Sequence, residues 1–520
     1  MPETVRMPQA GRLLSAGLLV LVVSLRAAAL LYPHPLNIDE ARYLVAAHHL
    51  RTGVGYSDWR GPEIDIHPLH PALVATLGSS IESLEDRGRA VTFACSLLLL
   101  WPLGVLAMRL GGPKVMVLSV LFAAGNPRLI LASTSVQPES LYVLLTAVAM
   151  VALWPGLAGS IPAWRWALAG ALYGLAYLAR PEGLLVGFLA CGLVLLGSDD
   201  PRRAKLLRFG AFAAALLAFA SPYLLFLRSA TGEWTVTGKT AELFFVGQSL
   251  HDGRGNPPDV SVYLALLDRW KGVMPFIAAN PGKVAMRVAD NAMQIGVRGL
   301  PLGLGPVGLA GLMACAAVLL PQRGQRLRLA FVAAPALTLV LMLLTFRNDR
   351  VIASVLPFLL VAAAAGLVAA AGRLDLLRGR RLTWICVGLA GTVLCGWLPL
   401  AVRAARSDIP DVSLDRRAVK VALERAGSGG FLASNNPALS FHAFDPLLFG
   451  PPGRYSPLPW LESCGTLAAA LHDRGARIAL LDGGFESRVP GLDSNECPLS
   501  EAAAFEDRAG DRRISILAWR

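Results

Sequence analysis

Charged residues are scarce in this sequence. Only 16% of its 520 residues are Asp, Glu, Lys or Arg, whereas ordinary globular domains carry roughly 25%. Hydrophobic residues make up 54% of the chain. This composition excludes a string of soluble domains. It favours a chain that spends most of its length in a membrane.

A patch of basic residues interleaved with aromatics is also missing. The net charge of +12 would otherwise suggest nucleic acid as a partner. Instead, Lys and Arg gather in short links between apolar runs, as membrane insertion requires. Arg6 and Arg12 precede the first apolar run, but no clear small-residue cleavage site follows. We therefore expect a retained first span rather than a cleaved signal peptide, and no nucleic-acid partner.

Cysteine is rare, with seven in the chain. Five fall inside apolar runs, where they are expected to act as small buried hydrophobes: Cys95, Cys191, Cys315, Cys386 and Cys395. Cys464 and Cys497 lie in the polar C-terminal region. They could form a disulfide if that region is outside the cytoplasm, or remain free thiols.

Long apolar runs dominate what is present. A run of about 18 residues can cross a hydrocarbon core of roughly 30 Å as a helix. Eleven predicted spans fit the sequence, at about 13–32, 89–108, 115–131, 136–154, 164–179, 182–197, 206–227, 299–320, 328–346, 351–371 and 382–402. The predicted fold class is an α-helical polytopic membrane protein. Residues 1–404 form the transmembrane domain and residues 405–520 a small α/β domain.

The basic residues in short links predict the orientation. With the N-terminus in the cytoplasm, the inner links hold Arg109, Lys114, Arg165, Arg202, Arg203, Lys205, Arg208, Arg323, Arg326, Arg328, Arg373, Arg378, Arg380 and Arg381. The short outer links hold only Arg180, Arg347 and Arg350. By the positive-inside rule, the loops at 33–88 and 229–298 and the C-terminal domain lie outside the cytoplasm.

The first outer loop opens with two adjacent carboxylates, Asp39 and Glu40. Asn37 is a plausible N-cap, and Glu40 at the third helical position completes a capping box. Apolar residues follow at helical spacing up to Gly53: Tyr43, Ala46, Ala47 and Leu50. The pattern predicts an amphipathic helix at the membrane surface. Acidic residues at a helix N-terminus are favourable without any function, so spacing alone leaves their role open.

The second outer loop, 229–298, is long, polar and rich in Gly and Pro, with apolar patches at Leu243–Val246 and Val273–Ala278. Loops of this length often serve as lids or binding elements. We expect re-entrant or interfacial helices here.

The C-terminal region has soluble composition and alternating helix-like and strand-like segments. The pattern predicts helices at Ala418–Ala426 and Leu467–Arg474, and strands at Gly430–Ala433, Arg477–Leu481 and Ile514–Trp519. Gly483-Gly484 is typical of a turn rather than of a phosphate-binding loop. No nucleotide or redox cofactor is expected.

Ionisable residues also gather at the outer ends of spans, where they are costly and tend to be functional: His67, His70, Glu139, Arg180, Glu182, Arg347 and Arg350. Asp39, Glu40, His67 and His70 could together bind a divalent metal ion such as Mg, Mn or Zn, or the histidines could simply bond to backbone. Arg180 and Arg347 suit a lipid phosphate, or they could snorkel at the interface.

Several of these motifs resemble membrane glycosyltransferases of the GT-C class. The most specific is Asp39-Glu40-Ala41-Arg42-Tyr43-Leu44 after the first span. Weaker matches lie at 53–56, 67–71, 135–142, 180–183 and 347–357. The chain is similar to bacterial lipid A aminoarabinose transferases, Rhizobium-type lipopolysaccharide core transferases and protein O-mannosyltransferases. The resemblance covers about residues 10–400 and the placement of a C-terminal extracytoplasmic domain.

The resemblance implies transfer of a hexosyl or pentosyl group outside the bacterial cytoplasmic membrane. The donor would be a polyprenyl-phosphate sugar and the acceptor a hydroxyl of a cell-envelope glycan, lipid or protein. Asp39 would be the general base, and Glu40 would support it or help bind a metal. Other residues at matching positions would bind donor phosphate or substrate: Arg42, Tyr43, His67, His70, Glu139, Arg180, Glu182 and Arg347.

One departure concerns the phosphate. The aminoarabinose transferases carry Glu-Lys-Pro where this chain has Ile66-His67-Pro68, so the matching lysine is missing. His67 or His70 could substitute for it, or the donor could sit differently.

Two other classes of function compete with the transferase. A transporter or lipid flippase would be expected to carry charges at mid-membrane and an inverted repeat. Here the charges lie at one face and no such repeat is apparent. A non-catalytic scaffold would use the C-terminal domain to bind partners, and it would tolerate substitution of Asp39.

Overall fold

The computed structural model describes most of the membrane domain and parts of the C-terminal domain. The described residues are 36–77, 83–251, 269–270, 272–345, 349–373, 412–426, 431–434, 436–442, 448–449, 464–473, 476–483, 497–506 and 513–519, with single residues between 20 and 30, Arg26 among them. The predicted span at 382–402 and the predicted domain boundary at 404 lie outside these ranges, and so does Arg347.

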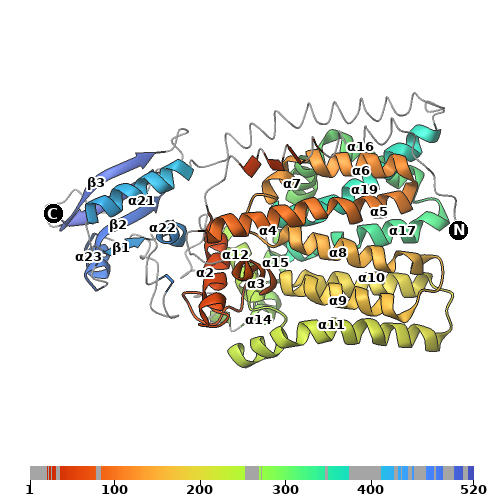
Figure 1. Ribbon diagram of the computed structural model, residues 1–520, viewed down its shortest axis with the longest axis horizontal. Coiled ribbons are helices and arrows are strands. Elements are labelled where there is room, and N and C mark those ends of the chain that lie inside the picture. Colours follow the sequence, from red (N-terminus) through yellow and green to blue (C-terminus); the bar gives the residue numbers. More distant parts are fainter. Residues whose placement is uncertain are drawn as a thin grey trace.

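Long apolar helices lie side by side and form the body of the molecule (Figure 1). They are α4 Leu84–Leu98, α5 Leu100–Gly111, α6 Pro113–Gly125, α7 Pro127–Ala132, α8 Glu139–Leu153, α9 Ala163–Ala179, α10 Glu182–Gly197, α11 Arg202–Thr231, α16 Leu300–Val318, α17 Arg323–Ala333, α18 Thr338–Leu344 and α19 Asp349–Arg373. Among the described residues, six helical segments are long and apolar enough to cross a membrane. The helical membrane architecture is confirmed.

The predicted spans within the described ranges coincide with these helices, although their ends differ. The predicted span at 115–131 is divided at Asn126, which has an extended backbone and caps α7. Pro127 at the first position of α7 cannot donate a helical hydrogen bond, so α6 ends there. Helix α11 is longer than the span predicted at 206–227, because it continues to Thr231 and ends at Gly232.

Shorter helices cover one end of the bundle, the end that also carries the C-terminal domain (Figure 1). They are α2 Ile38–Thr52, α3 Leu69–Thr76, α12 Lys239–His251, α14 Val273–Ala279 and α15 Pro281–Met293. The apolar patches of the second loop therefore form helices, as predicted. The described parts of both long loops lie at this end.

Helix α2 has the predicted capping box. The Asn37 side chain accepts from the Glu40 amide, and the Glu40 carboxylate accepts from the Asn37 amide. Gly53 ends the helix in the left-handed conformation, φ 78°. The expectation of an amphipathic surface helix is wrong, because α2 is buried nearly all round from Glu40 to Ala47. It packs against α3, α4 and the C-terminal domain rather than against lipid.

The C-terminal domain contains helices and a sheet, as predicted, but the sheet has four strands where three were predicted. Its strands are β1 Phe431–Ser434, β2 Ala476–Gly483, β3 Leu499–Glu506 and β4 Arg513–Trp519, in the order β1-β2-β4-β3. β1 is parallel to β2, and the other pairs are antiparallel. The helices are α21 Val412–Ala426, α22 Pro437–His442 and α23 Cys464–Asp473. Cys464 and Cys497 form a disulfide.

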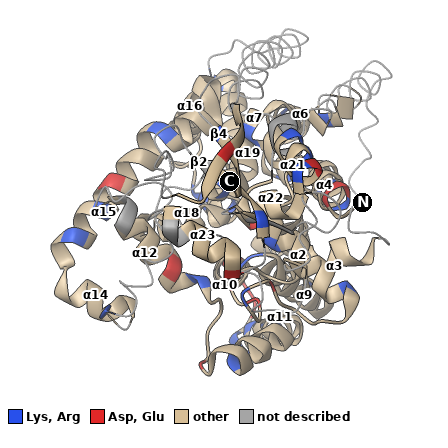
Figure 2. Cartoon of the chain, turned by 90° about the vertical axis from the view of Figure 1, so that its left-hand side faces the viewer, with Lys and Arg blue, Asp and Glu red and all other residues tan. Residues whose placement is uncertain are grey.

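The C-terminal domain packs directly on α2. Phe441 and Leu448 belong to the same buried apolar cluster as the residues of α2. The Phe449 ring lies 5.3 Å from the His48 ring near the end of α2. Figure 2 shows this end of the molecule, with α2 and α22 near each other and acidic and basic residues interspersed.

Candidate active site

Asp39, in the first turn of α2, lies between two cations. Its Oδ2 is 2.6 Å from Nη1 of Arg350 at the start of α19. Its Oδ1 is 3.7 Å from Nζ of Lys239, the first residue of α12. Three helices that are far apart in the sequence thus bring two positive groups to one carboxylate.

The ion pairs continue inward from Arg350. Its Nε donates to Oε1 of Glu139 over 2.9 Å. The same oxygen accepts from Nη1 of Arg180 at 2.5 Å. Arg180 in turn forms a two-pronged pair with Glu182, at 2.8 and 3.2 Å. Lys239, Asp39, Arg350, Glu139, Arg180 and Glu182 therefore form one row of alternating charges, which we call the ion-pair row.

The ion-pair row is open at one end and buried at the other. The side chains of Asp39 and Arg350 are 30% and 27% exposed, and that of Lys239 is 22% exposed. By contrast, the side chains of Glu139, Arg180 and Glu182 are 4%, 13% and 12% exposed. A ligand approaching from outside would therefore meet Asp39 and its two cations first.

The surroundings of Asp39 stabilise its charged form. The Lys239 ammonium has the largest effect and, with the Arg350 guanidinium, holds the pKa of Asp39 well below its usual range. Partial burial acts in the opposite direction but does not prevail. In this state Asp39 is ionised at neutral pH, and it is also a weak base.

Glu40 is placed differently from Asp39. Its side chain is fully buried. Oε2 accepts from the Asn37 amide at 2.9 Å, and Oε1 accepts from the Val136 amide at 2.8 Å. These bonds fix the start of α2 to the segment before α8. The catalytic or metal-binding role of Glu40 stays a prediction, and in this structure both of its carboxylate oxygens accept from backbone amides.

Arg42 is the centre of a second, separate cluster. Its guanidinium bonds to Asp58 at 3.0 Å, to Glu63 at 2.8 Å and to Asp65 at 2.9 Å. Arg42 is 4% exposed. It is thus fully engaged in holding the loop after α2, and these contacts leave it poorly placed to bind a donor phosphate.

Tyr43, His67 and His70 are buried packing residues in this structure. The rings of Tyr43 and His70 meet edge to face at 5.4 Å. The His67 ring lies 5.0 Å from Tyr177 and 4.9 Å from Tyr223. Burial lowers the pKa of His67 to about 3 and that of His70 to about 4. Both imidazoles are therefore neutral at pH 7, and neither supplies the positive charge of the missing lysine.

A metal site does not assemble from the residues predicted for it. Glu40 is saturated by backbone amides and His67 is enclosed by tyrosines. Throughout the described ranges, no group of three or more His, Cys, Asp or Glu side chains could hold a metal ion. The donor set around Asp39 consists of cations, which repel a divalent metal. These residues do not fit a resident metal.

Sequence reasoning missed Lys239 and gave Arg350 less weight than Arg347. Lys239 lies in a polar loop with no motif around it, and Arg350 is 311 positions from Asp39. Periodicity cannot predict such pairs. Arg180 and Glu182 were both predicted as site residues, but their ion pair was not.

Part of the chain matches a known family. Residues 66–226 match the model of the dolichyl-phosphate-mannose-protein mannosyltransferase family. The match includes Glu139, Arg180 and Glu182, but Asp39, Lys239 and Arg350 lie outside it. No curated protein sequence matches the chain.

Solved structures share the architecture over nearly the whole chain. ArnT from Cupriavidus metallidurans, bound to undecaprenyl phosphate, superposes with a TM-score of 0.60 at 13% identity, covering 98% of each chain. AglB, the oligosaccharyltransferase from Archaeoglobus fulgidus, in complex with an inhibitory peptide and a dolichol-phosphate, gives 0.55 at 13% identity. That alignment covers 91% of this chain and 70% of AglB. A structure of the same archaeal enzyme with Zn and sulfate gives 0.56 at 12% identity, covering 89% and 68%.

Identities this low establish a common fold. That fold is the GT-C arrangement of membrane helices followed by a C-terminal domain, which the motifs around Asp39 had suggested. The chain thus shares the GT-C fold of these membrane enzymes, and its residues 66–226 match the mannosyltransferase family model.

Proposed function

We propose that this protein is a membrane glycosyltransferase that moves a hexosyl or pentosyl group from a polyprenyl-phosphate donor to a hydroxyl acceptor. The acceptor belongs to a cell-envelope glycan, a lipid or a protein. The observation that supports this most directly is Asp39, a partly exposed carboxylate held between Lys239 and Arg350. Such a site offers a base for a hydroxyl and two cations for a phosphate.

The reaction is a single displacement at the anomeric carbon. The acceptor oxygen attacks this carbon while its proton passes to Asp39. The bond from the anomeric carbon to the phosphate oxygen breaks, and its electron pair leaves with polyprenyl phosphate. The anomeric configuration inverts. Lys239 and Arg350 stabilise the charge that accumulates on the leaving phosphate.

The two cations couple donor binding to the strength of the base. In this structure they lower the pKa of Asp39. A phosphate that shares Lys239 and Arg350 brings negative charge to the same place, and this raises the pKa of Asp39 towards its ordinary value. The carboxylate becomes a better base when the donor is in position.

Arg180 acts indirectly in this scheme. Both of its ion-pair partners are carboxylates, Glu139 and Glu182. Because these two already compensate its positive charge, Arg180 attracts a phosphate only weakly. Its contact with Glu139 instead fixes the carboxylate that holds Arg350. Arg347, for which a phosphate-binding role was predicted, remains a proposal.

The proposed location of the reaction is the outer face of the bacterial cytoplasmic membrane. The distribution of basic residues supports this orientation. The disulfide between Cys464 and Cys497 also supports it, because disulfides persist in oxidising compartments outside the cytoplasm. The proposed partners are thus a lipid-linked sugar, an envelope acceptor and membrane lipids.

The test is sugar transfer from a labelled polyprenyl-phosphate donor in membranes containing the protein or its Asp39→Asn variant. We expect transfer to fall at least about a hundredfold, the lower range for a general base, with unchanged abundance in the membrane. Asp86→Asn, an exposed carboxylate on α4 at the same end, is the matched control. Equal transfer by the protein and Asp39→Asn would exclude Asp39 as the base.

A further inference from the structure

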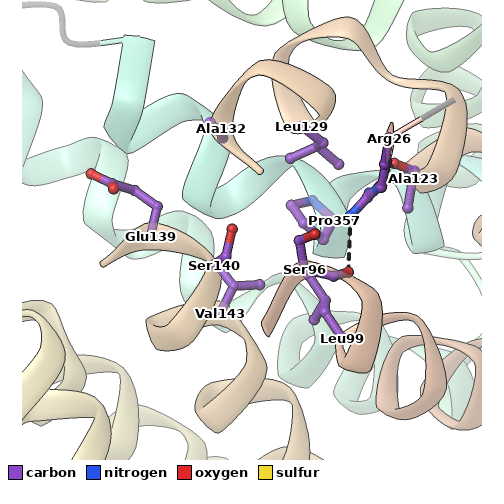
Figure 3. Close-up of a pocket in the computed structure, with 11 residues that line it drawn as sticks. Arg26, Ser96, Leu99, Ala123, Leu129, Ala132, Glu139, Ser140, Val143 and Pro357 are labelled. Carbon is purple, nitrogen blue, oxygen red and sulfur yellow. Dashed lines mark hydrogen bonds between the residues drawn. The ribbon is translucent and has the colours of Figure 1, made fainter. Parts of the chain in front are cut away.

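A small cavity of about 20 Å³, room for roughly one water-sized molecule or small ion, lies among α4, α6, α7, α8 and α19, behind the ion-pair row. Apolar side chains form most of its wall, among them Leu99, Leu129 and Val143 (Figure 3). Its polar side chains include Arg26 and Ser140. The mechanism proposed above uses neither of them.

Arg26 comes from the predicted first span and is 1% exposed. Its Nη1 donates to the Ser96 carbonyl at 2.9 Å, and its Nη2 donates to the Ala123 carbonyl at 3.0 Å. The second contact has a clear cause, because Pro127 has no N–H with which to continue the helix onto Ala123. The Nε–H has no hydrogen-bond partner in the described part of the protein.

Among the described residues, no carboxylate pairs with the charge of Arg26. Both of its hydrogen-bond partners are neutral carbonyls, and the sequence has no Asp or Glu between positions 4 and 38. Glu139 lines the same cavity, and its Oε1 pairs with both Arg180 and Arg350, while its buried Oε2 has no hydrogen-bond partner among the described residues. Its side chain points away from the other labelled residues in Figure 3. An isolated guanidinium in an apolar membrane interior is costly unless an anion compensates it.

We propose that this cavity binds a small inorganic anion, with the chemistry of a halide such as chloride. The Nε–H of Arg26 and the hydroxyl of Ser140 are the donors, and the apolar remainder of the wall suits a weakly hydrated ion. The bound anion neutralises Arg26 and joins the first span to α8, the helix that carries Glu139. This inference is independent of the proposed transferase activity.

Thermal unfolding of the purified protein tests the inference. Chloride or bromide replaces gluconate at constant ionic strength, so that general screening stays the same. Because an anion that binds only the folded state stabilises it, we expect the melting temperature to rise by about 2 °C or more. Arg26→Gln should abolish this rise, and Ser140→Ala should reduce it.

Arg287→Gln is the matched control. Arg287 is also 1% exposed and donates to two carbonyls, but it does not line this cavity. This variant should be less stable and should still respond to chloride. An equal response in Arg26→Gln, or no response in the unmodified protein, would overturn the inference.

Two further measurements decide the case if Arg26→Gln fails to fold. Ala132→Leu adds volume to the wall of the cavity and should remove the chloride response while keeping Arg26. A crystal grown in bromide should show an anomalous peak beside Arg26. Water alone at that position would show that the cavity is hydrated and not an anion site.

Discussion

Asp39 shares its two cations with the phosphate that it is proposed to face. Lys239 and Arg350 come from different helices and reach different oxygens of the carboxylate. Each cation therefore has a separate effect on the basicity of Asp39, and substitution of one leaves the other in place.

Lys239→Gln should move the acid side of the pH profile for transfer to higher pH. Lys239 is the largest cause of the lowered pKa of Asp39, so removing its charge raises that pKa. Protonation then inactivates the base at a higher pH. We expect a shift of roughly one pH unit in the acid limb of kcat, because kcat reports the donor-bound enzyme, in which the pKa of Asp39 is nearer its ordinary value. The profile is measured with a labelled donor between pH 3 and pH 7.

Lys114→Gln, which removes an exposed charge at the start of α6, serves as the control and should leave the profile unchanged. A shift of the profile towards lower pH in Lys239→Gln would contradict the electrostatic assignment.

Glu40→Gln should lower the stability of the protein while leaving the rate of sugar transfer nearly unchanged. One amide oxygen can still accept from Asn37 or Val136, but the other contact is lost. We expect a loss of roughly 1 kcal/mol in the free energy of unfolding and transfer within about threefold of the original. Glu40→Ala removes both acceptors and should be less stable than Glu40→Gln.

Thermal melts and transfer rates measured on the same samples check this. A rate loss in Glu40→Gln as large as that of Asp39→Asn, with an unchanged melting temperature, would instead assign Glu40 to the chemistry.

At the scale of elements, α15 holds the segment that leads to Arg350. Arg287 donates to the Leu344 carbonyl at 2.9 Å. The Asn291 amide lies within 3.3 Å of the carbonyls of Met342, Leu343 and Thr345. These carbonyls belong to the last turn of α18 and its end, where helices leave acceptors unpaired. α15 thus fixes the end of α18, five residues before Arg350.

Asn291→Ala should weaken donor binding without touching the donor. Loss of these bonds leaves the end of α18 free to move, and small displacements of a positioned group are costly to catalysis. We expect kcat/KM to fall about tenfold, mainly through a higher KM for the donor. Asn291→Asp, which places a carboxylate against these carbonyl oxygens, should lower kcat/KM at least as far as Asn291→Ala.

Steady-state kinetics over a range of donor concentrations check this prediction. A normal KM in both variants would show that α15 does not position Arg350.

Helix α2 shows what local sequence can and cannot predict. Asn37, Glu40 and Gly53 determine where it begins and ends, and all three effects are local. Its burial depends on the C-terminal domain, more than 380 positions away in the sequence. No helical pattern within 38–52 could indicate that partner, so the prediction of a surface helix was wrong.

At the scale of the whole molecule, the membrane helices were predictable because hydropathy alone determines them. The strand β3 was not, since Leu499–Glu506 is rich in Ala and Glu rather than in β-branched residues. Only part of the candidate site could be predicted from the sequence. The motif indicates Asp39, whereas the pairing of Asp39 with Lys239 and Arg350 depends on how three distant helices pack.

The packing of the C-terminal domain on α2 limits how the protein can be divided. A chain cut after residue 404 would lose Phe441, Leu448 and Phe449 together. The face of α2 that packs on these residues would then be exposed to water. The helix that carries Asp39 would lose one of its walls, so a shortened protein that is inactive would say nothing about whether the removed domain touches substrate.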